Sequence, residues 1–231
     1  MLDPVAVPEA ARILGLSPTR VRAMAVNGGL PAAKIGDRWL IERSAVERRR
    51  NQGAPSGRPF APHNAWALLL LASGEDVEGL DPSVRSRLRR ALELEGLEKL
   101  APRLDRRAEV KRFSGHPGEV SYVLEDPAVV RSGISAAGAH GFDLVSGGEV
   151  DGYLRESELK KFAKNHALTP SGFEGNVHLR LVPEEAWRFP QGTSIAPIAA
   201  VALDLAEDPD SRSTRAGQRA LRDLDHDRPR R

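Results

Sequence analysis

The segment of residues 51–62 most limits how this chain can fold. It has few residues that could be buried in a core, whereas the stretches on either side of it have many. It holds three prolines and two glycines, and these residues interrupt regular helices and strands. At roughly 100–200 residues per domain, a chain of 231 residues forms one or two domains. We therefore predict a domain over residues 1–50, a linker over 51–62 that its prolines make semi-stiff, and a second domain over 63–231.

The first domain reads as two helices, a hairpin and a third helix. Gly15 can supply the backbone angles of a tight turn after the first helix. Ser17 is a favourable N-cap for a second helix over residues 18–27. A short hairpin follows over residues 33–41, and the capping pattern at Ser44 opens the third helix. This order predicts a small winged helix-turn-helix.

The second helix has the pattern of a DNA-reading helix. On a helical wheel Val21, Met24 and Ala25 face inward, while Arg20 and Arg22 flank the outer face. An apolar inner stripe with arginine at the outer edge suits the major groove. The candidate DNA-binding residues are Ser17, Thr19, Arg20, Arg22 and Asn27 of this helix and its cap, with Lys34 and Arg38 of the wing.

Charge along the chain agrees with a DNA-binding head. Residues 1–60 carry ten basic and five acidic groups, although the whole chain has a net charge of only +2. Such asymmetry is expected when one end meets phosphate. Lys34 and Arg38 lie on either side of the wing turn, within reach of phosphate, while Trp39 is expected to pack under the wing. A helix-turn-helix retained only for protein contacts stays open as an alternative.

Four short stretches of the first domain, in order, resemble the winged helix-turn-helix of the MerR and excisionase families. They are residues 7–11, 14–22, 29–32 and 35–41. The resemblance implies that Thr19, Arg20 and Arg22 lie on the recognition helix, and that Lys34 and Arg38 lie on the wing.

The second domain has a mixed pattern. Residues 63–73 look helical, and Asp81-Pro82 caps another helix in which Val84, Leu88, Ala91 and Leu92 have helical spacing. Residues 150–154 and 176–182 alternate like strands. Residues 195–207 and 211–224 read as a terminal pair of helices. The whole chain is therefore predicted to be α+β, with the small winged domain followed by a larger mixed α/β domain.

No catalytic or metal-binding constellation stands out in the sequence. The six histidines are scattered without a paired metal spacing, and there is no cysteine. Asp204, Asp208 and Asp210 could form a metal cluster, but the run Asp208-Pro209-Asp210 is better read as the end of one helix and the start of the next. We expect no enzyme activity, no metal and no cofactor, and an enzyme targeted to DNA is the least favoured alternative.

Two further stretches, residues 126–144 and 196–221, resemble the AbiEi-like antitoxins of type IV toxin–antitoxin systems. The first contains the run SGISAA followed by HGFDL, and the second contains the runs VALDLA and DP before a last helix. The resemblance implies an antitoxin that represses its own promoter and is paired with a nucleotidyltransferase-like toxin.

The sequence as a whole favours a cytoplasmic DNA-binding antitoxin and autorepressor acting on double-stranded DNA. Its longest apolar run, residues 65–72, is far shorter than the ~18 residues of a membrane span, so no membrane role is expected. A homodimer is possible. The alternative is an excisionase- or MerR-like regulator with an unrelated effector or partner-binding domain.

Overall fold

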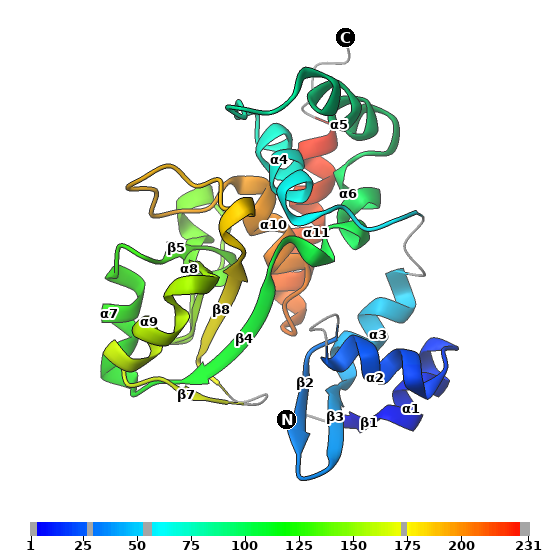
Figure 1. The fold of residues 1–231 in the computed structure, drawn as a ribbon, viewed down its shortest axis with the longest axis vertical. Coiled ribbons are helices and arrows are strands. Elements are labelled where there is room, and N and C mark those ends of the chain that lie inside the picture. Colours follow the sequence, from blue (N-terminus) through cyan, green and yellow to red (C-terminus); the bar gives the residue numbers. More distant parts are fainter. Residues whose placement is uncertain (1–3, 27–29, 53–56, 172–174, 227–231) are drawn as a thin grey trace.

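The computed structural model describes residues 4–26, 30–52, 57–171 and 175–226. Its first part, here called the head, contains three short strands and three helices (Figure 1). These elements are β1 (Pro4–Ala6), α1 (Val7–Leu14), α2 (Pro18–Val26), β2 (Ala32–Ile35), β3 (Arg38–Glu42) and α3 (Arg43–Gln52). The strands form an antiparallel sheet in the order β1-β3-β2.

The local signals in the head produce the predicted turns. Gly15 ends α1 in the left-handed conformation with φ 65°, which glycine adopts without strain. The Arg20 backbone N–H donates to Ser17 Oγ at 3.3 Å, so Ser17 caps α2. Gly36 has φ 59° in the hairpin turn between β2 and β3. The predicted end of α2 beyond Val26 lies outside the described residues.

The third helix begins one residue earlier than predicted and also ends later. It starts at Arg43, and the Ser44 hydroxyl donates to the Glu42 carboxylate instead of capping the helix. The helix also runs through Gln52, two residues into the predicted linker. Asn51 and Gln52 are polar but can continue a helix, unlike the glycine that follows.

The second part, here called the body, begins with helix α4 and is mixed in secondary structure. The predicted α+β class is confirmed. Its helices are α4 (Pro62–Ala72), α5 (Pro82–Glu95), α6 (Leu97–Leu100), α7 (Val120–Glu125), α8 (Gly133–Ala136), α9 (Leu159–Asn165), α10 (Ile198–Ala206) and α11 (Ser211–His226). Its strands are β4 (Glu109–Ser114), β5 (Val130–Arg131), β6 (Val150–Arg155), β7 (Thr169–Pro170) and β8 (Val177–Val182).

The body is organised around a five-stranded mixed sheet in the order β5-β6-β8-β4-β7. Strands β6 and β8 are parallel, and the other pairs are antiparallel. A parallel pair requires a crossover connection, and helix α9 lies within it. Both faces of β6 are buried, since Leu154 packs with residues of α7 and α9 while Tyr153 packs toward α4 and α10.

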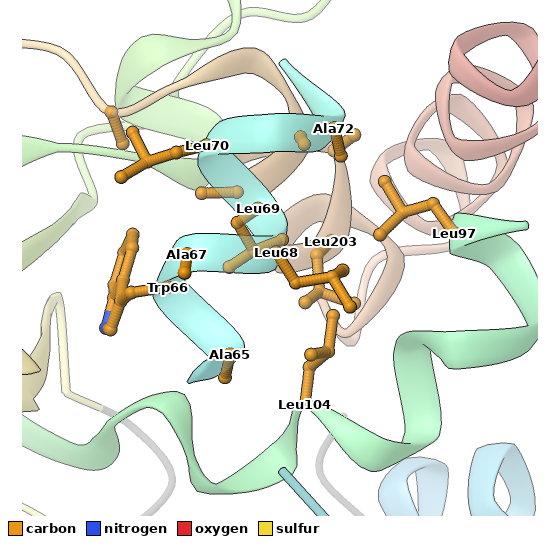
Figure 2. Packing of buried hydrophobic residues seen from close by; sticks show 14 of the residues in the cluster. Ala65, Trp66, Ala67, Leu68, Leu69, Leu70, Ala72, Leu97, Leu104 and Leu203 are labelled. Carbon is orange, nitrogen blue, oxygen red and sulfur yellow. The ribbon is translucent and has the colours of Figure 1, made fainter. Parts of the chain in front are cut away.

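The larger core of the body is built around α4 and α10, two short helices that are buried almost all round. Every residue from Ala65 to Leu70 is buried, and Trp66, Leu68 and Leu69 extend from α4 toward different neighbours (Figure 2). The Trp66 ring packs edge-on against Tyr153 and donates its N–H to the Arg107 carbonyl at 3.0 Å. The apolar run of the sequence is therefore a core helix. No helix in the described ranges is long and apolar enough to cross a membrane.

Helices α10 and α11 pack face to face at an unusually close distance. Gly217 of α11 is buried, and a Cβ at that position would overlap the backbone of Ala206 and Ala202. A residue without a side chain is therefore needed where the two helices cross.

The described end of the predicted linker is packed on the body. Phe60 donates its backbone N–H to the Arg103 carbonyl at 2.9 Å, and the Arg103 guanidinium lies over its ring. Pro62, predicted as the last linker residue, is instead in the first turn of α4, where proline costs no hydrogen bond.

Candidate nucleic-acid interface

Helix α2 is held with one face in the core of the head. Val21 and Ala25 are buried against α1 and β3, and Met24 is partly buried beside them. This is the inner stripe that the helical wheel predicts. The anchoring leaves the opposite face of α2 on the surface.

The exposed face of α2 presents the predicted contact residues to solvent. Thr19, Arg20 and Arg22 are all exposed, and no ion pair joins either arginine to another described residue. Val26, at the end of α2, is 56% exposed, which is unusual for a large apolar side chain and offers a contact for a thymine methyl group. These residues therefore have the exposure and the chemistry that base and phosphate contacts require.

Ser17 and Asn27 differ from the other predicted contact residues. Ser17 is exposed and its oxygen caps α2, but its hydroxyl proton remains available for a phosphate oxygen. Asn27 lies outside the described residues, so its predicted contact stays a prediction.

The wing places Lys34 and Arg38 on opposite faces of the hairpin. Lys34 pairs with Trp39, and Ile35 pairs with Arg38. Directly opposed residues of an antiparallel pair share a face, and neighbours along a strand alternate. Both basic residues are exposed, but they cannot approach one phosphate from the same side of the ribbon.

Lys34 lies on the same side of the sheet as the core of the head. The facing strand contributes Trp39 and Ile41 to that side, where both pack against the head's core and α2 contacts the sheet. Trp39 is partly buried there, as predicted. Arg38 lies on the other side, next to Ile35, which is 62% exposed. Of the two wing residues, Lys34 is therefore the one that shares a side with α2.

The side of the sheet that carries Arg38 also contacts the body. Glu42 is buried, and its carboxylate lies 3.2 Å from a guanidinium nitrogen of Arg112 on β4. An ion pair with little exposure to solvent restrains the head relative to the body. Sequence reasoning missed this contact, because nothing local links residues seventy positions apart.

Beyond the head, the most concentrated group of charges is a buried cluster against the sheet of the body. Asp204 of α10 is fully buried, with Arg107 Nη2 and Arg180 Nε 2.6 and 2.9 Å from its Oδ1. The Tyr153 hydroxyl donates to the same oxygen at 2.9 Å. Arg180 also pairs with Asp151. We call Arg107, Asp151, Tyr153, Arg180 and Asp204 the buried charge cluster.

Burial and pairing shift the pKa values of the two carboxyl groups of this cluster in opposite directions. Burial raises the pKa of Asp151 to about 7, and the Arg180 guanidinium beside it offsets this only in part. Burial also raises the pKa of Asp204, but the attraction of Arg180 and Arg107 outweighs it and holds that pKa below its usual range. Asp204 is therefore the permanent anion of the cluster.

The buried charge cluster has the properties of a structural core. The charged members of the cluster neutralise one another. The part of the chain that the structure describes contains no group of three or more His, Asp or Glu residues placed to hold a metal. Asp204 lies buried in the last turn of α10, within the helix predicted over residues 195–207. Asp210 caps α11 by accepting the Ser213 N–H at 2.9 Å, at the predicted start of the next helix.

Comparison with known proteins identifies the head. Residues 6–54 match a family model described as a helix-turn-helix domain. No curated protein and no solved structure matched the chain. The N-terminal helix-turn-helix domain indicates a DNA-binding transcription regulator.

Proposed function

We propose that this chain is a DNA-binding antitoxin that represses its own promoter and opposes a nucleotidyltransferase-like toxin. The head would bind operator DNA through α2 and Lys34, and the body would oppose the toxin without catalysing a reaction. The proposal places the protein in the cytoplasm and, because one small head reads a short site, on DNA as a homodimer or on tandem sites.

The observation that carries the head's part of the proposal is that both arginines of α2 are exposed and neither forms an ion pair with another described residue. Arg20 and Arg22 flank a face that is held outward by the buried Val21 and Ala25. Arginine can contact guanine edges with two hydrogen bonds or bind phosphate.

The body's part rests on the two stretches that resemble AbiEi-like antitoxins. These stretches pack on each other, since the Ser132 hydroxyl donates to Asp204 and His140 Nε2 lies 2.8 Å from the Ala196 carbonyl. Gly133, within the first stretch, has φ 46°, and a Cβ there would overlap the Asp151 carboxylate. Close packing thus requires a small residue at Gly133 of the motif, which supports the interpretation of both stretches as one structural unit.

A growth assay tests the body's part. The gene beside this one is expressed alone in a heterologous bacterium and then together with this chain. We expect growth arrest with the neighbour alone and recovery on co-expression. A harmless neighbour, or arrest that persists with this chain present, would contradict the antitoxin role.

A gel-shift assay with promoter DNA tests the head's part. An Arg20→Ala, Arg22→Ala double variant should bind at least tenfold more weakly, because each base contact contributes about 1–3 kcal/mol. An Arg87→Ala variant, which removes an exposed arginine from α5, serves as the control. Unchanged binding by the double variant would refute the assignment. If the two activities are separate, the double variant still rescues growth.

A further inference from the structure

The body contains a cleft that the proposed function does not use. It has a volume of about 780 Å³ and lies between the loop at Gly141–Leu144, the start of α10 and one face of α11. Sites for small ligands typically measure about 300–1,000 Å³ and combine apolar walls with a few polar groups. The cleft is therefore large enough for a small organic molecule.

One wall of the cleft is basic. Arg212, Arg215 and Arg219 line it from α11, and spacings of three and four residues place them on one face of a helix. All three are exposed, and none forms an ion pair with another described residue. Arg215 Nε donates to the Ser211 carbonyl at 3.1 Å, and its two terminal nitrogens form no hydrogen bond with another described residue.

This arrangement of charge is unfavourable for the helix itself. Arg212 lies in the first turn of α11, where the helix dipole repels a cation, although the Asp210 carboxylate that caps this turn offsets part of that repulsion. Three cations on one face also repel one another. An anion bound between them would relieve both repulsions.

The cleft also has an apolar part. Phe142 and Leu144 of the loop and Ile198 at the start of α10 line the cleft and are each only partly buried. Apolar side chains that border a basic wall fit a ligand with an apolar body and an anionic group.

Two acidic residues also line the cleft, but their positions leave one end basic. Asp223 follows Arg219 by four residues and is its neighbour on the helix surface, but it lies about 16 Å along the helix from Arg212 at 1.5 Å per residue. Asp143 lies in the loop between Phe142 and Leu144. The end of the cleft near Arg212 and Arg215 is therefore the one suited to an anion.

We propose that this cleft binds a small organic anion, with its carboxylate or phosphate group on Arg212, Arg215 and Arg219 and its apolar body against Phe142, Leu144 and Ile198. The inference goes beyond the proposed function and does not depend on it. Ligand binding at this site would favour the alternative of a regulator with an effector domain.

A fluorescence titration with 8-anilinonaphthalene-1-sulfonate, an aromatic sulfonate, tests the proposal on the full chain without DNA. The native chain should bind one equivalent in a saturable manner, and inorganic phosphate should weaken the binding. An Arg215→Gln, Arg219→Gln double variant should lose at least tenfold in affinity. The matched control is Arg222→Gln, which removes an arginine of the same helix that pairs with Glu98 outside the cleft.

A second probe separates charge recognition from general apolar binding. N-phenyl-1-naphthylamine has the same aromatic body without the sulfonate, so it should bind at least tenfold more weakly and ignore the arginine substitutions. A Phe142→Ala variant should weaken both probes. Equal binding of the two probes, equal affinity of the double variant and the control, or a lack of saturable binding would each overturn the proposal.

Discussion

Replacing Asp204 by asparagine should destabilise the body more than any other single loss of charge in the described part of the chain. The carboxylate is fully buried and accepts hydrogen bonds from Arg107, Tyr153 and Ser132 while pairing with Arg180. Asparagine has nearly the same shape, but it is neutral and turns one acceptor into a donor. Two buried guanidiniums would then share the remaining carboxylates.

The loss in unfolding free energy depends on which buried charges lose their partner when Asp204 is replaced. Breaking a buried ion pair by removing one partner costs about 3–5 kcal/mol, because the other charge is left buried and uncompensated. Arg107 keeps Glu207, whose carboxylate is partly exposed, and Arg180 keeps Asp151. Asp151 should also ionise more readily, since the negative charge of Asp204 contributes to its raised pKa. We therefore expect the lower part of this range, about 3 kcal/mol.

Urea unfolding followed by tryptophan fluorescence measures the loss, because Trp66 packs against Tyr153 of the cluster and Trp187 packs against the same hydrophobic core. A Glu98→Gln variant is the control: it breaks the exposed pair with Arg222, and such pairs contribute at most about 1 kcal/mol. If Asp204→Asn lowers the free energy of unfolding no more than Glu98→Gln does, the buried charge cluster does not hold the body together.

Three further outcomes are expected. Lys34→Ala should weaken promoter binding more than Arg38→Ala, because Lys34 lies on the side of the wing that α2 shares; equal losses in a gel shift would contradict this. Gly217→Ala should lower the free energy of unfolding by at least about 1–3 kcal/mol, since its Cβ would meet backbone of α10, and an unchanged urea midpoint would refute it. Asp151 has a raised pKa in the folded state, so its contribution to stability is greatest below pH 4 and falls as pH rises to about 7, by at most about 1.4 kcal/mol per pH unit. The stability difference between the native chain and Asp151→Asn should therefore shift in favour of the variant over that window, and a difference that is flat with pH would show that Asp151 stays ionised.

Much of the fold could be predicted because its signals are local. The turn at Gly15, the cap at Ser17 and the apolar run of α4 each act within a few residues. The mixed sheet was harder to predict, because the parallel pairing of β6 with β8 depends on a crossover and not on any pattern within either strand. Local signals thus locate elements better than they arrange them.

The parts of the candidate sites that could not be predicted all depend on distant residues. The faces of the wing follow from register, which the sequence of one strand does not specify. The contact between Glu42 and Arg112 and the pairing of Arg107 with Asp204 join residues seventy and ninety-seven positions apart. A charged residue in an alternating strand normally faces solvent, so Arg180 gave no sign that it is buried.

Arginine shows why net charge alone is a weak guide to function in this chain. Arg180 is buried and paired with two carboxylates, and Arg222 forms an exposed ion pair with Glu98. Arg20 and Arg215 have the same formal charge, yet each is exposed and forms no ion pair with another described residue. Only cations of this last kind can attract a phosphate or a carboxylate at full strength, because paired ones must first release a partner. Helices α2 and α11 both carry arginines of this kind, and each is therefore a surface on which binding should be sought.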